Sequence, residues 1–190
     1  MSDIRKEINS ALKVLKEGGV ILYPTDTIWG IGCDATNEAA VAKVYAIKER
    51  ADTKSMLALI HTEALLASYV TTVPEIAWEL IEAAVDPLTI IYPAAKNLAK
   101  NLIGRDQTIG IRITKDDFCT QLISRFRKPV VSTSANLSGH SAPANFFEIN
   151  KSIREKVDYT VNWRQDDYTR AKPSSIIKLG IGGEINIIRK

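Results

Sequence analysis

The sequence predicts an α/β fold built on a mixed sheet. Through the middle of the chain, apolar runs of strand length alternate with segments of helical periodicity, an order that is typical of a sheet with helices packed against it. Near the end, two strand-like segments flank a glycine-rich turn at 180–183, which indicates an antiparallel hairpin. No linker, internal repeat or shift in composition divides residues 1–190, so we expect a single domain with flanking helices.

The first elements can be placed by their apolar spacing and their end signals. Ser2–Glu17 carries its apolar residues on one helical stripe, and two glycines follow it. Val20–Pro24 is a continuous apolar run, which favours a strand covered on both faces, and a loop is expected next. Asn37 can cap a helix that continues to about Lys48. The next predicted elements are a strand over Met56–Ile60 and helices over Thr62–Tyr69 and Pro74–Ala84.

The remaining elements continue the same alternation. Short β-branched runs bounded by turn residues predict the strands, and helical spacing predicts the helices between them. The predicted strands cover Leu88–Tyr92, Thr108–Ile113, Pro129–Ser134, Ser175–Leu179 and Glu184–Ile188, a helix covers Asp116–Phe126, and a helix–strand pair lies within Phe146–Val161.

The composition is that of an ordinary globular protein with a mildly basic balance. Of the 190 residues, 45% are hydrophobic and 25% are charged, and the formal net charge is +3. Such a charge permits an anionic partner but does not demand one. The start of the chain lacks the apolar core of a signal peptide, and no stretch approaches the roughly 18 apolar residues of a membrane span. We therefore expect a cytoplasmic protein without membrane contact.

Several common kinds of site are absent from the sequence. Neither Gly-x-x-x-x-Gly-Lys-Ser/Thr nor Gly-x-Gly-x-x-Gly after a strand occurs, and the Gly-x-Ser-x-Gly of serine hydrolases is missing. Cys33, Cys119, His61 and His140 are too few and too scattered for a disulfide framework or a metal cluster, so no metal site is predicted. Chemistry must therefore rest on hydroxyl groups and cations near strand ends.

One candidate site lies on the predicted strand Thr108–Ile113. Alternation places Thr108 and Arg112 on one face, and Gly110 between them leaves space. An arginine beside exposed backbone can clamp a carboxylate or a phosphate. The same pattern also occurs in a half-exposed strand whose arginine points into water, so the strand by itself leaves both interpretations open.

Two other polar segments are also ambiguous. Ser132 and Ser134 lie on one face near the end of their predicted strand, where hydroxyls can contact a ligand, but a Ser/Asn/Gly turn has the same composition. Lys48, Arg50 and Lys54 follow a helix, where cations either complement the helix dipole or hold a triphosphate. Lys48 and Arg50 can converge only if the helix ends near Lys48.

Six motifs follow one another along essentially the whole chain. They are Tyr-Pro-Thr-Asp-Thr-x-x-Gly-x-Gly at Tyr23–Gly32, Lys-x-Arg at Lys48–Arg50 with Lys54, Thr-x-Gly-x-Arg at Thr108–Arg112, Ser-x-Ser-Ala-Asn-Leu-Ser-Gly at Ser132–Gly139, Pro-Ser-Ser-Ile at Pro173–Ile176, and Arg189. In this order and spacing the set resembles the YrdC family of threonylcarbamoyl-AMP synthases. Each motif alone is weak, but six in register are specific.

The resemblance implies a fold, a reaction and a set of site residues. The family's fold is a single α/β domain with a twisted, open mixed sheet and a basic cavity. Its reaction joins L-threonine, bicarbonate and ATP, escorted by Mg²⁺, to give threonylcarbamoyl-AMP and pyrophosphate without a tightly bound prosthetic group. The product goes to a complex that modifies tRNAs reading ANN codons. By resemblance, Lys48 and Arg50 are catalytic, Thr27, Arg112, Ser132 and Ser174 bind threonine, and Arg50, Lys54, Thr108, Ser134, Asn136 and Arg189 bind ATP, with Lys48 and Asn136 lining the same cavity.

Some residues depart from the family pattern, and three alternative functions stay open. Ser55, Asp86 and Ser175 replace residues that the family commonly has, and Asp86 lacks the backbone freedom of glycine. A paralogue of unassigned activity would diverge at the Lys-x-Arg and Ser-Ala-Asn segments, which are intact here. A carbamoyltransferase domain related to hydrogenase maturation would normally sit in a longer chain. A double-stranded RNA or tRNA binder has little support from a net charge of +3, although weak RNA binding is compatible with it.

Overall fold

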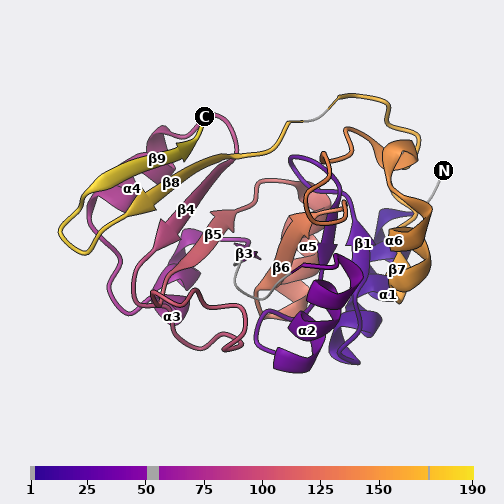
Figure 1. Ribbon diagram of the computed structural model, residues 1–190, viewed down its shortest axis with the longest axis horizontal. Helices are drawn as coiled ribbons and strands as arrows, with labels where there is room; N and C mark the ends of the chain where they lie inside the picture. Colours follow the sequence, from indigo (N-terminus) through magenta and orange to yellow (C-terminus); the bar gives the residue numbers. More distant parts are fainter. Residues whose placement is uncertain (1–2, 51–55, 171) are drawn as a thin grey trace.

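The computed structural model describes residues 3–50, 56–170 and 172–190. These residues form one nine-stranded sheet, in the order β7-β1-β2-β6-β3-β5-β4-β8-β9, with helices packed on it (Figure 1). The strands are β1 (Ile21–Tyr23), β2 (Gly30–Gly32), β3 (Leu57–Ile60), β4 (Leu88–Tyr92), β5 (Ile109–Ile113), β6 (Val130–Ser134), β7 (Tyr159–Thr160), β8 (Ser175–Leu179) and β9 (Ile185–Arg189). The helices are α1 (Ile4–Lys16), α2 (Glu38–Ile47), α3 (Leu66–Tyr69), α4 (Ile76–Ala83), α5 (Asp117–Phe126) and α6 (Lys151–Lys156), with 3₁₀ turns η1 (Glu63–Leu65) and η2 (Phe146–Glu148).

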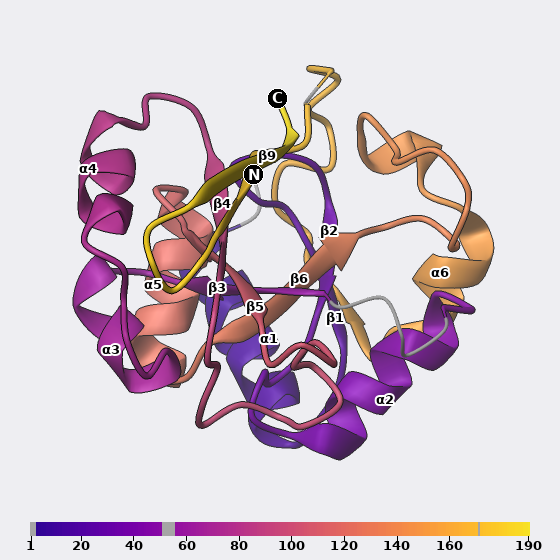
Figure 2. The same ribbon diagram turned by 60° about the vertical axis from the view of Figure 1, so that its left-hand side comes forward.

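The sheet is mixed, which confirms the predicted fold class. The pairs β1–β7, β3–β5 and β4–β8 are parallel, and the C-terminal hairpin β8–β9 is antiparallel, as predicted. In Figure 1, β4, β8 and β9 occupy one half of the molecule with α3 and α4, whereas β1 and β7 occupy the other half with α1, α5 and α6. The sheet is twisted between the two halves, so that β6 runs obliquely to β4 in Figure 2.

The N-terminal helix and the first strand form as their apolar patterns predict. In α1, Asp3 caps the first turn by accepting a hydrogen bond from the Arg5 amide at 2.9 Å, and Ile8 and Leu15 are buried against α5. In β1, Ile21 joins this α1–α5 cluster, while Leu22 joins the larger core on the other side of the sheet. The strand is therefore covered on both faces. Within the described residues, no helix is long and apolar enough to cross a membrane.

Two segments differ from the prediction. The expected loop after β1 contains a strand, β2, which lies between β1 and β6. The sequence did not indicate β2, because glycine is a poor strand former. At position 32, however, only glycine fits: a Cβ there would lie 2.3 Å from the Val131 carbonyl oxygen and 2.6 Å from the Tyr23 ring. The helix expected over Thr62–Tyr69 is shorter and is split into η1 and α3.

A long connection joins the two halves of the molecule. Between β7 and β8 the chain crosses from the half that holds α6 to the half that holds β9, over the top of the sheet in Figure 1. We call residues 162–170 and 172–174 the strap. Its end delivers Pro173 and Ser174 to the main cavity described below.

Candidate active site

A cavity of about 340 Å³ lies over one face of β5, β4 and β8, and we call it the main cavity. Its volume is within the range of small-molecule sites, roughly 300–1,000 Å³. The sequence-predicted residues that line it are Thr27, Arg50, Thr108, Arg112, Ser132, Ser134, Ser174 and Arg189. The fold thus brings together residues from at least six separate segments of the chain.

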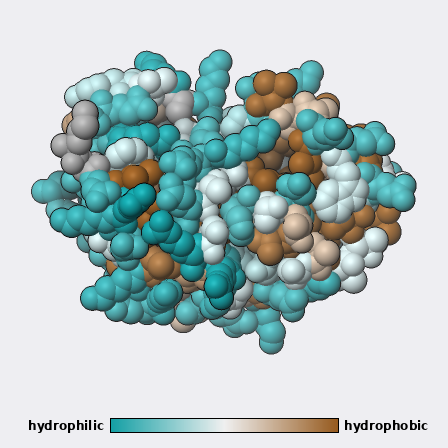
Figure 3. Space-filling view, turned by 180° about the vertical axis from the view of Figure 1, so that it is seen from behind, coloured by the Kyte–Doolittle hydropathy of each residue, from teal (hydrophilic) through white to brown (hydrophobic). Residues whose placement is uncertain are grey.

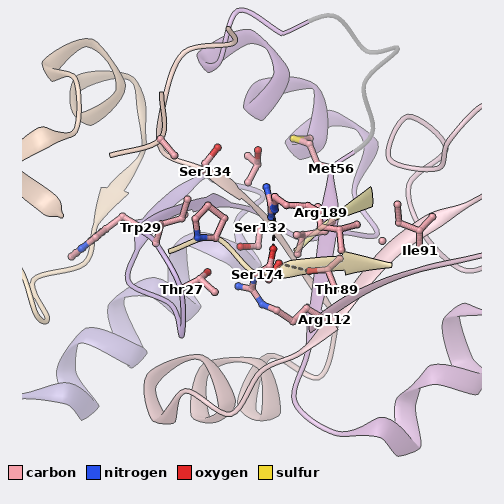
Figure 4. A pocket seen from close by; sticks show the side chains of 18 of the residues that line it. Thr27, Trp29, Met56, Thr89, Ile91, Arg112, Ser132, Ser134, Ser174 and Arg189 are labelled. Carbon is pink, nitrogen blue, oxygen red and sulfur yellow. Dashed lines mark hydrogen bonds between the residues drawn. The ribbon is translucent and has the colours of Figure 1, made fainter. Parts of the chain in front are cut away.

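One row of side chains crosses the cavity floor from β5 to β9. Arg112 on β5 is opposite Thr89 on β4. Thr89 is opposite Ile176 on β8, which in turn is opposite Arg189 on β9. Directly opposed residues project from the same face of a sheet, and all four line the cavity. In Figure 4, Arg112 and Arg189 approach Ser174 from opposite sides.

A second row runs parallel to the first. Lys178 on β8 is opposite Ile91 on β4, and Ile91 is opposite Gly110 on β5. Leu57 on β3 continues the row from Gly110 to Ser132 on β6. Every member of this row also lines the cavity, so two consecutive inward positions of β4, β5 and β8 build the floor.

A β-bulge in β9 sets the direction of Arg189. Ile176 is opposite Arg189, whereas the next residue of β8, Ile177, is opposite Ile187, so that Ile188 is the extra residue of the bulge. Under strict alternation, Arg189 would share a face with Ile187 and point away from the cavity. The bulge returns Arg189 to the cavity face.

Arg112 is a buried cation with unused hydrogen-bonding capacity. The residue is only 3% exposed, and its Nη2 lies 2.9 Å from Oδ1 of Asp26. Its Nε is shielded from solvent and makes no hydrogen bond within the described part of the chain. Because buried polar atoms usually have partners, an unpaired N–H on a cavity-lining guanidinium is suited to a carboxylate or phosphate from a ligand.

Hydroxyl groups surround this arginine. Ser174 is buried, and its Oγ lies 2.8 Å from Oγ1 of Thr89. Thr27 is half-buried, with its Oγ1 3.0 Å from that of Thr25. Ser132 is buried on β6. The threonine-binding residues predicted from the resemblance therefore lie around one end of the main cavity, where their hydroxyls can give or accept hydrogen bonds.

The far end of the second row carries an ion pair. Asp106 accepts hydrogen bonds from the Thr108 hydroxyl and from Lys178 Nζ, both at 2.7 Å. These two bonds lower the pKa of Asp106 to about 2. The carboxylate is therefore charged at neutral pH, and it holds Lys178 and Thr108 beside the cavity.

Lys48 and Arg50 diverge after α2. The helix ends at Ile47, as convergence of the two cations would require, and Glu49 then adopts a left-handed conformation with φ of 50°. This turn sends Arg50 to the cavity, where burial lowers its pKa from the ordinary value. Lys48 instead turns beneath the loop that follows β6, and it does not line the cavity.

Lys48 acts as an internal clamp. It is 1% exposed, and its Nζ donates hydrogen bonds to the carbonyl oxygens of Ser134 and, at 2.7 Å, of Asn136. Its own carbonyl accepts from the Ser138 amide at 2.9 Å. Burial, together with the nearby Arg50 charge, lowers the pKa of Lys48 to about 7. The residue therefore fixes the segment that presents Ser134.

Asn136 also lies outside the cavity lining. Its Nδ2 donates to the carbonyl oxygens of Leu137 at 2.9 Å and His140 at 2.7 Å, so that its amide closes the turn after β6. In this structure the donors of Lys48 and Asn136 are taken up by backbone carbonyls, and neither side chain lines the main cavity. Their parts in catalysis and ATP binding stay predictions. Lys54 lies outside the described residues, and its part in ATP binding stays a prediction.

Sequence reasoning missed several lining residues. Lys178 and Thr89 were not singled out, although alternation in their predicted strands places them beside Ile176 and Arg112. Trp29 is only 6% exposed, as a core residue would be, but it also lines the cavity. Its ring packs on Phe146 with centroids 4.9 Å apart. The sequence alone does not single out Trp29, because a large apolar side chain is equally expected in a buried core and in the wall of a cavity.

Exposed aromatic side chains connect the strap to the segment before α6. The rings of Phe147 and Tyr168 stack with centroids 5.0 Å apart and planes 5° apart. On the same segment, Glu148 pairs with Arg170 of the strap at 3.4 Å. Arg164 of the strap donates to the Thr25 carbonyl at 3.1 Å. These contacts hold the strap beside the loop that carries Thr27.

Metal binding has no dedicated protein ligands in the described part of the chain. No group of three or more His, Cys, Asp or Glu side chains there could hold an ion. The described residues that line the main cavity also include no carboxylate. An ion that entered with a nucleotide would take its ligands from phosphate oxygens, hydroxyl groups and water, which suits Mg²⁺.

Comparison with known proteins identifies the family of this chain. The family model for Sua5/YciO/YrdC, described as telomere recombination, matches residues 13–190. The chain belongs to the Sua5/YciO/YrdC family. A threonylcarbamoyl-AMP synthase from Pseudoalteromonas translucida is 36% identical over 165 residues, and the match covers 85% of this chain and 88% of that protein. A Coxiella burnetii protein of the same name is 33% identical over 97% of this chain and 98% of its own length.

A solved structure of a Sua5/YciO/YrdC protein supports the same fold. Sua5 from P. abyssi complexed with L-threonine superposes with a TM-score of 0.83 at 23% sequence identity. The match covers 94% of this chain and 52% of that protein, so this chain spans about half of the longer relative. At this identity the likeness establishes the shared α/β fold.

Proposed function

We propose that this chain is a threonylcarbamoyl-AMP synthase, which converts L-threonine, bicarbonate and ATP to threonylcarbamoyl-AMP and pyrophosphate. The observation that carries the proposal is the buried Arg112, whose Nε has no partner in the described chain and which faces a cavity lined by hydroxyls and further cations. Relatives that match most of the chain bear the name of this enzyme, and a fold relative binds L-threonine.

Threonine would occupy the Arg112 end of the main cavity. Arg112 would take the carboxylate, and Thr27, Ser132 and Ser174 would surround the amino acid with hydroxyl groups. Asp26, paired to Arg112 at 2.9 Å, would keep the guanidinium fixed in direction before the substrate arrives. Such preorganisation reduces the entropy that binding must overcome.

ATP would occupy the part of the cavity that Arg50, Lys178 and Arg189 line, and Arg189 adjoins the proposed threonine site through its hydrogen bond to the Ser174 carbonyl at 2.9 Å. Thr108 and Ser134 would add hydroxyl contacts. Lys54, which lies outside the described residues, is expected to bind the phosphates. Lys48 and Asn136 would act indirectly, by holding the segment that presents Ser134. Mg²⁺ would enter as part of the nucleotide, since no carboxylate lines the described cavity.

The reaction needs positioning and charge neutralisation more than a protein nucleophile. The threonine amine attacks the carbon of bicarbonate, a nitrogen–carbon bond forms, and water leaves, which gives a carbamate. A carbamate oxygen then attacks the α-phosphorus of ATP, and the bond to the β-phosphate breaks to release pyrophosphate. Cations such as Arg50 would stabilise the charge that develops on the phosphates during this displacement.

The product would pass to a complex that transfers the threonylcarbamoyl group to tRNAs reading ANN codons. We also place the protein in the cytoplasm, where tRNA and ATP are available. Weak direct RNA binding stays a prediction, because the net charge of +3 provides few phosphate contacts. The main cavity is of small-molecule size, which favours an enzyme over an RNA binder as the principal function.

The proposal is tested by incubating the purified protein with ATP, Mg²⁺, bicarbonate and isotopically labelled threonine. We expect labelled threonylcarbamoyl-AMP and an equal amount of pyrophosphate. Arg112→Ala should abolish most of the product, whereas Arg5→Ala, a change at an exposed arginine of α1, should leave it unchanged. No product from wild type under these conditions would contradict the proposal and favour a paralogue with another substrate.

Serine and valine sharpen the same assay. Serine lacks only the methyl group, and a missing methyl is worth about 1–3 kcal/mol in an apolar pocket, so its kcat/KM should fall about 10–200-fold. Valine lacks the hydroxyl that Thr27, Ser132 and Ser174 would recognise, and it should be nearly inert. If valine matched serine in pyrophosphate release, hydroxyl recognition by this cavity would be wrong.

A further inference from the structure

β9 is one of the two edge strands of the sheet. Its inner edge pairs with β8, and among the described residues no strand pairs with its outer edge. An unpaired edge presents a row of backbone donors and acceptors, which is a template for another strand. Natural proteins usually protect such an edge with lysine, proline or a covering loop. The centre of β9, Ile185–Ile188, contains neither lysine nor proline.

The side chains of β9 make its outer part apolar. Ile185, Ile187 and Ile188 are 50%, 56% and 53% exposed. Because Ile187 and Ile188 together oppose Ile177 at the bulge, both lie on the side away from the main cavity, where Ile177 packs against the core. Figure 3 shows apolar surface gathered over the half of the molecule that holds α4, β8 and β9.

Charge differs between the two ends of the strand. Glu184 precedes β9, whereas Arg189 and Lys190 stand at its other end. Antiparallel pairing of two identical strands places the acidic end of one against the basic end of the other, at both ends of the ribbon. Parallel pairing would instead oppose like charges. The sequence of β9 is therefore complementary to itself in the antiparallel direction only.

We propose that a second copy of this chain pairs antiparallel along β9, which makes the protein a two-fold symmetric dimer with one continuous sheet. The isoleucines of the two strands cover one another, and Glu184 lies near Lys190 of the partner subunit. A two-fold axis uses the same surface on both copies, so each favourable contact occurs twice. The pairing also holds in place the strand that carries Arg189 into the main cavity. The proposal does not depend on the proposed function.

Sedimentation velocity across the micromolar range tests the dimer. We expect wild type to sediment as a dimer and Ile187→Lys to sediment as a folded monomer. Its unfolding temperature should equal that of wild type diluted below the dimer dissociation constant, because position 187 is exposed in the isolated chain. Phe147→Lys is the matched control, since Phe147 is also 56% exposed but lies in η2, on the other half of the molecule. A monomeric wild type, or a dimer that survives Ile187→Lys, would overturn the proposal.

Charge reversal distinguishes self-pairing from the capture of another protein. Glu184→Lys and Lys190→Glu should each raise the dimer dissociation constant about three- to thirtyfold, since each change removes two symmetric contacts. The double variant restores opposite charges and should recover most of the affinity. If the double variant is folded but dissociates as readily as the single variants, β9 does not pair with a second β9. Glu184 accepts a hydrogen bond from the Gly182 amide, so Glu184→Lys could also weaken the turn before β9. Lys190→Glu does not affect this hydrogen bond and therefore tests the charge pair by itself.

Discussion

Arg112 and Arg189 stand at opposite ends of one cross-strand row, yet the chain holds them differently. Arg112 projects from β5, with paired strands on both sides, is 3% exposed, and is oriented by Asp26. Arg189 projects from the edge strand β9, is exposed, and is held through a hydrogen bond from its Nε to the Ser174 carbonyl at 2.9 Å. The direction of Arg112 is therefore fixed by the centre of the sheet, whereas that of Arg189 depends on the strap and the edge of the sheet.

This difference matches the proposed ligands. A small amino acid offers few contacts, so its site benefits from groups that are fixed before it binds. A nucleotide is larger and brings several charges, and it can be held by peripheral cations that remain partly solvated. The pKa of Arg189 is lowered by partial burial and by Arg112, which indicates that an anion between the two arginines would relieve their repulsion.

The largest expected effect is at the central end. Arg112→Ala should weaken threonine binding about tenfold to over a hundredfold, because a hydrogen bond to a charged group is worth about 1.5–3 kcal/mol. ATP binding should remain within about twofold, on the same scale. Isothermal titration calorimetry with each ligand separates the two. Threonine affinity that stayed near the wild-type value would show that Arg112 is not its carboxylate partner.

A second effect concerns the buried clamp Lys48. Its pKa is about 7 in the folded chain and 10.5 for an ordinary lysine, so between these values the unfolded chain binds a proton that the folded chain does not. The free energy of unfolding should therefore rise with pH over this window, by up to about 1.4 kcal/mol per pH unit. Below pH 7 both states are protonated, and the cost of burying the charge is fully present.

Lys48→Met, which keeps the aliphatic length but cannot titrate, should remove this pH dependence. Urea unfolding of wild type and variant at pH 7 and pH 9 measures it. The variant should also be less stable at pH 9, because the carbonyls of Ser134 and Asn136 lose their donor. Equal pH slopes for the two proteins would show that Lys48 keeps its proton in the folded state.

The outer end should respond more weakly. Arg189→Ala and Arg50→Ala should each weaken ATP binding by up to about fivefold and leave threonine binding nearly unchanged, because exposed or half-exposed ion contacts are worth about 0.2–1 kcal/mol. Raising the salt concentration should reduce the difference from wild type. A loss of threonine affinity as large as that of ATP would place the two ligands the other way round.

A comparable effect is expected at Thr89, which connects Arg112 to Ser174. Thr89→Val keeps the side-chain shape but removes the oxygen that lies 2.8 Å from Ser174. The loss of one buried hydrogen bond, about 1 kcal/mol, should raise the KM for threonine about fivefold. Thr133→Val, a lining threonine on β6 outside both floor rows, serves as the control. An unchanged KM in Thr89→Val would show that Ser174 is positioned by the strap alone.

Periodicity predicted most of the fold because apolar spacing decides which face of an element is buried. α1, α5 and β4 appear where their patterns placed them. β2 was missed, since its Gly32 is required by the close approach of Val131 on β6 and Tyr23 on β1. No local rule contains that information, because the contact exists only after β6 has docked.

The candidate site shows the same division. Alternation correctly placed Thr108 and Arg112 on one face, and both line the cavity. Alternation could not show where Lys48 would point, because that depends on the left-handed turn at Glu49 and on carbonyls supplied by the loop after β6. It would also have turned Arg189 outwards, since a bulge leaves no mark in a run of isoleucines.

That bulge makes the length of β9 adjustable. If Ile188 were deleted, Ile187 and the arginine would become regular neighbours, and alternation would still aim the arginine at the cavity beside Ile176. Only the outward surface would lose a side chain. Insertions and deletions in a strand usually exchange its two faces, but here one residue can be gained or lost on the solvent side alone. In evolution, the outer surface of this strand can therefore change in length without disturbing the arginine in the cavity.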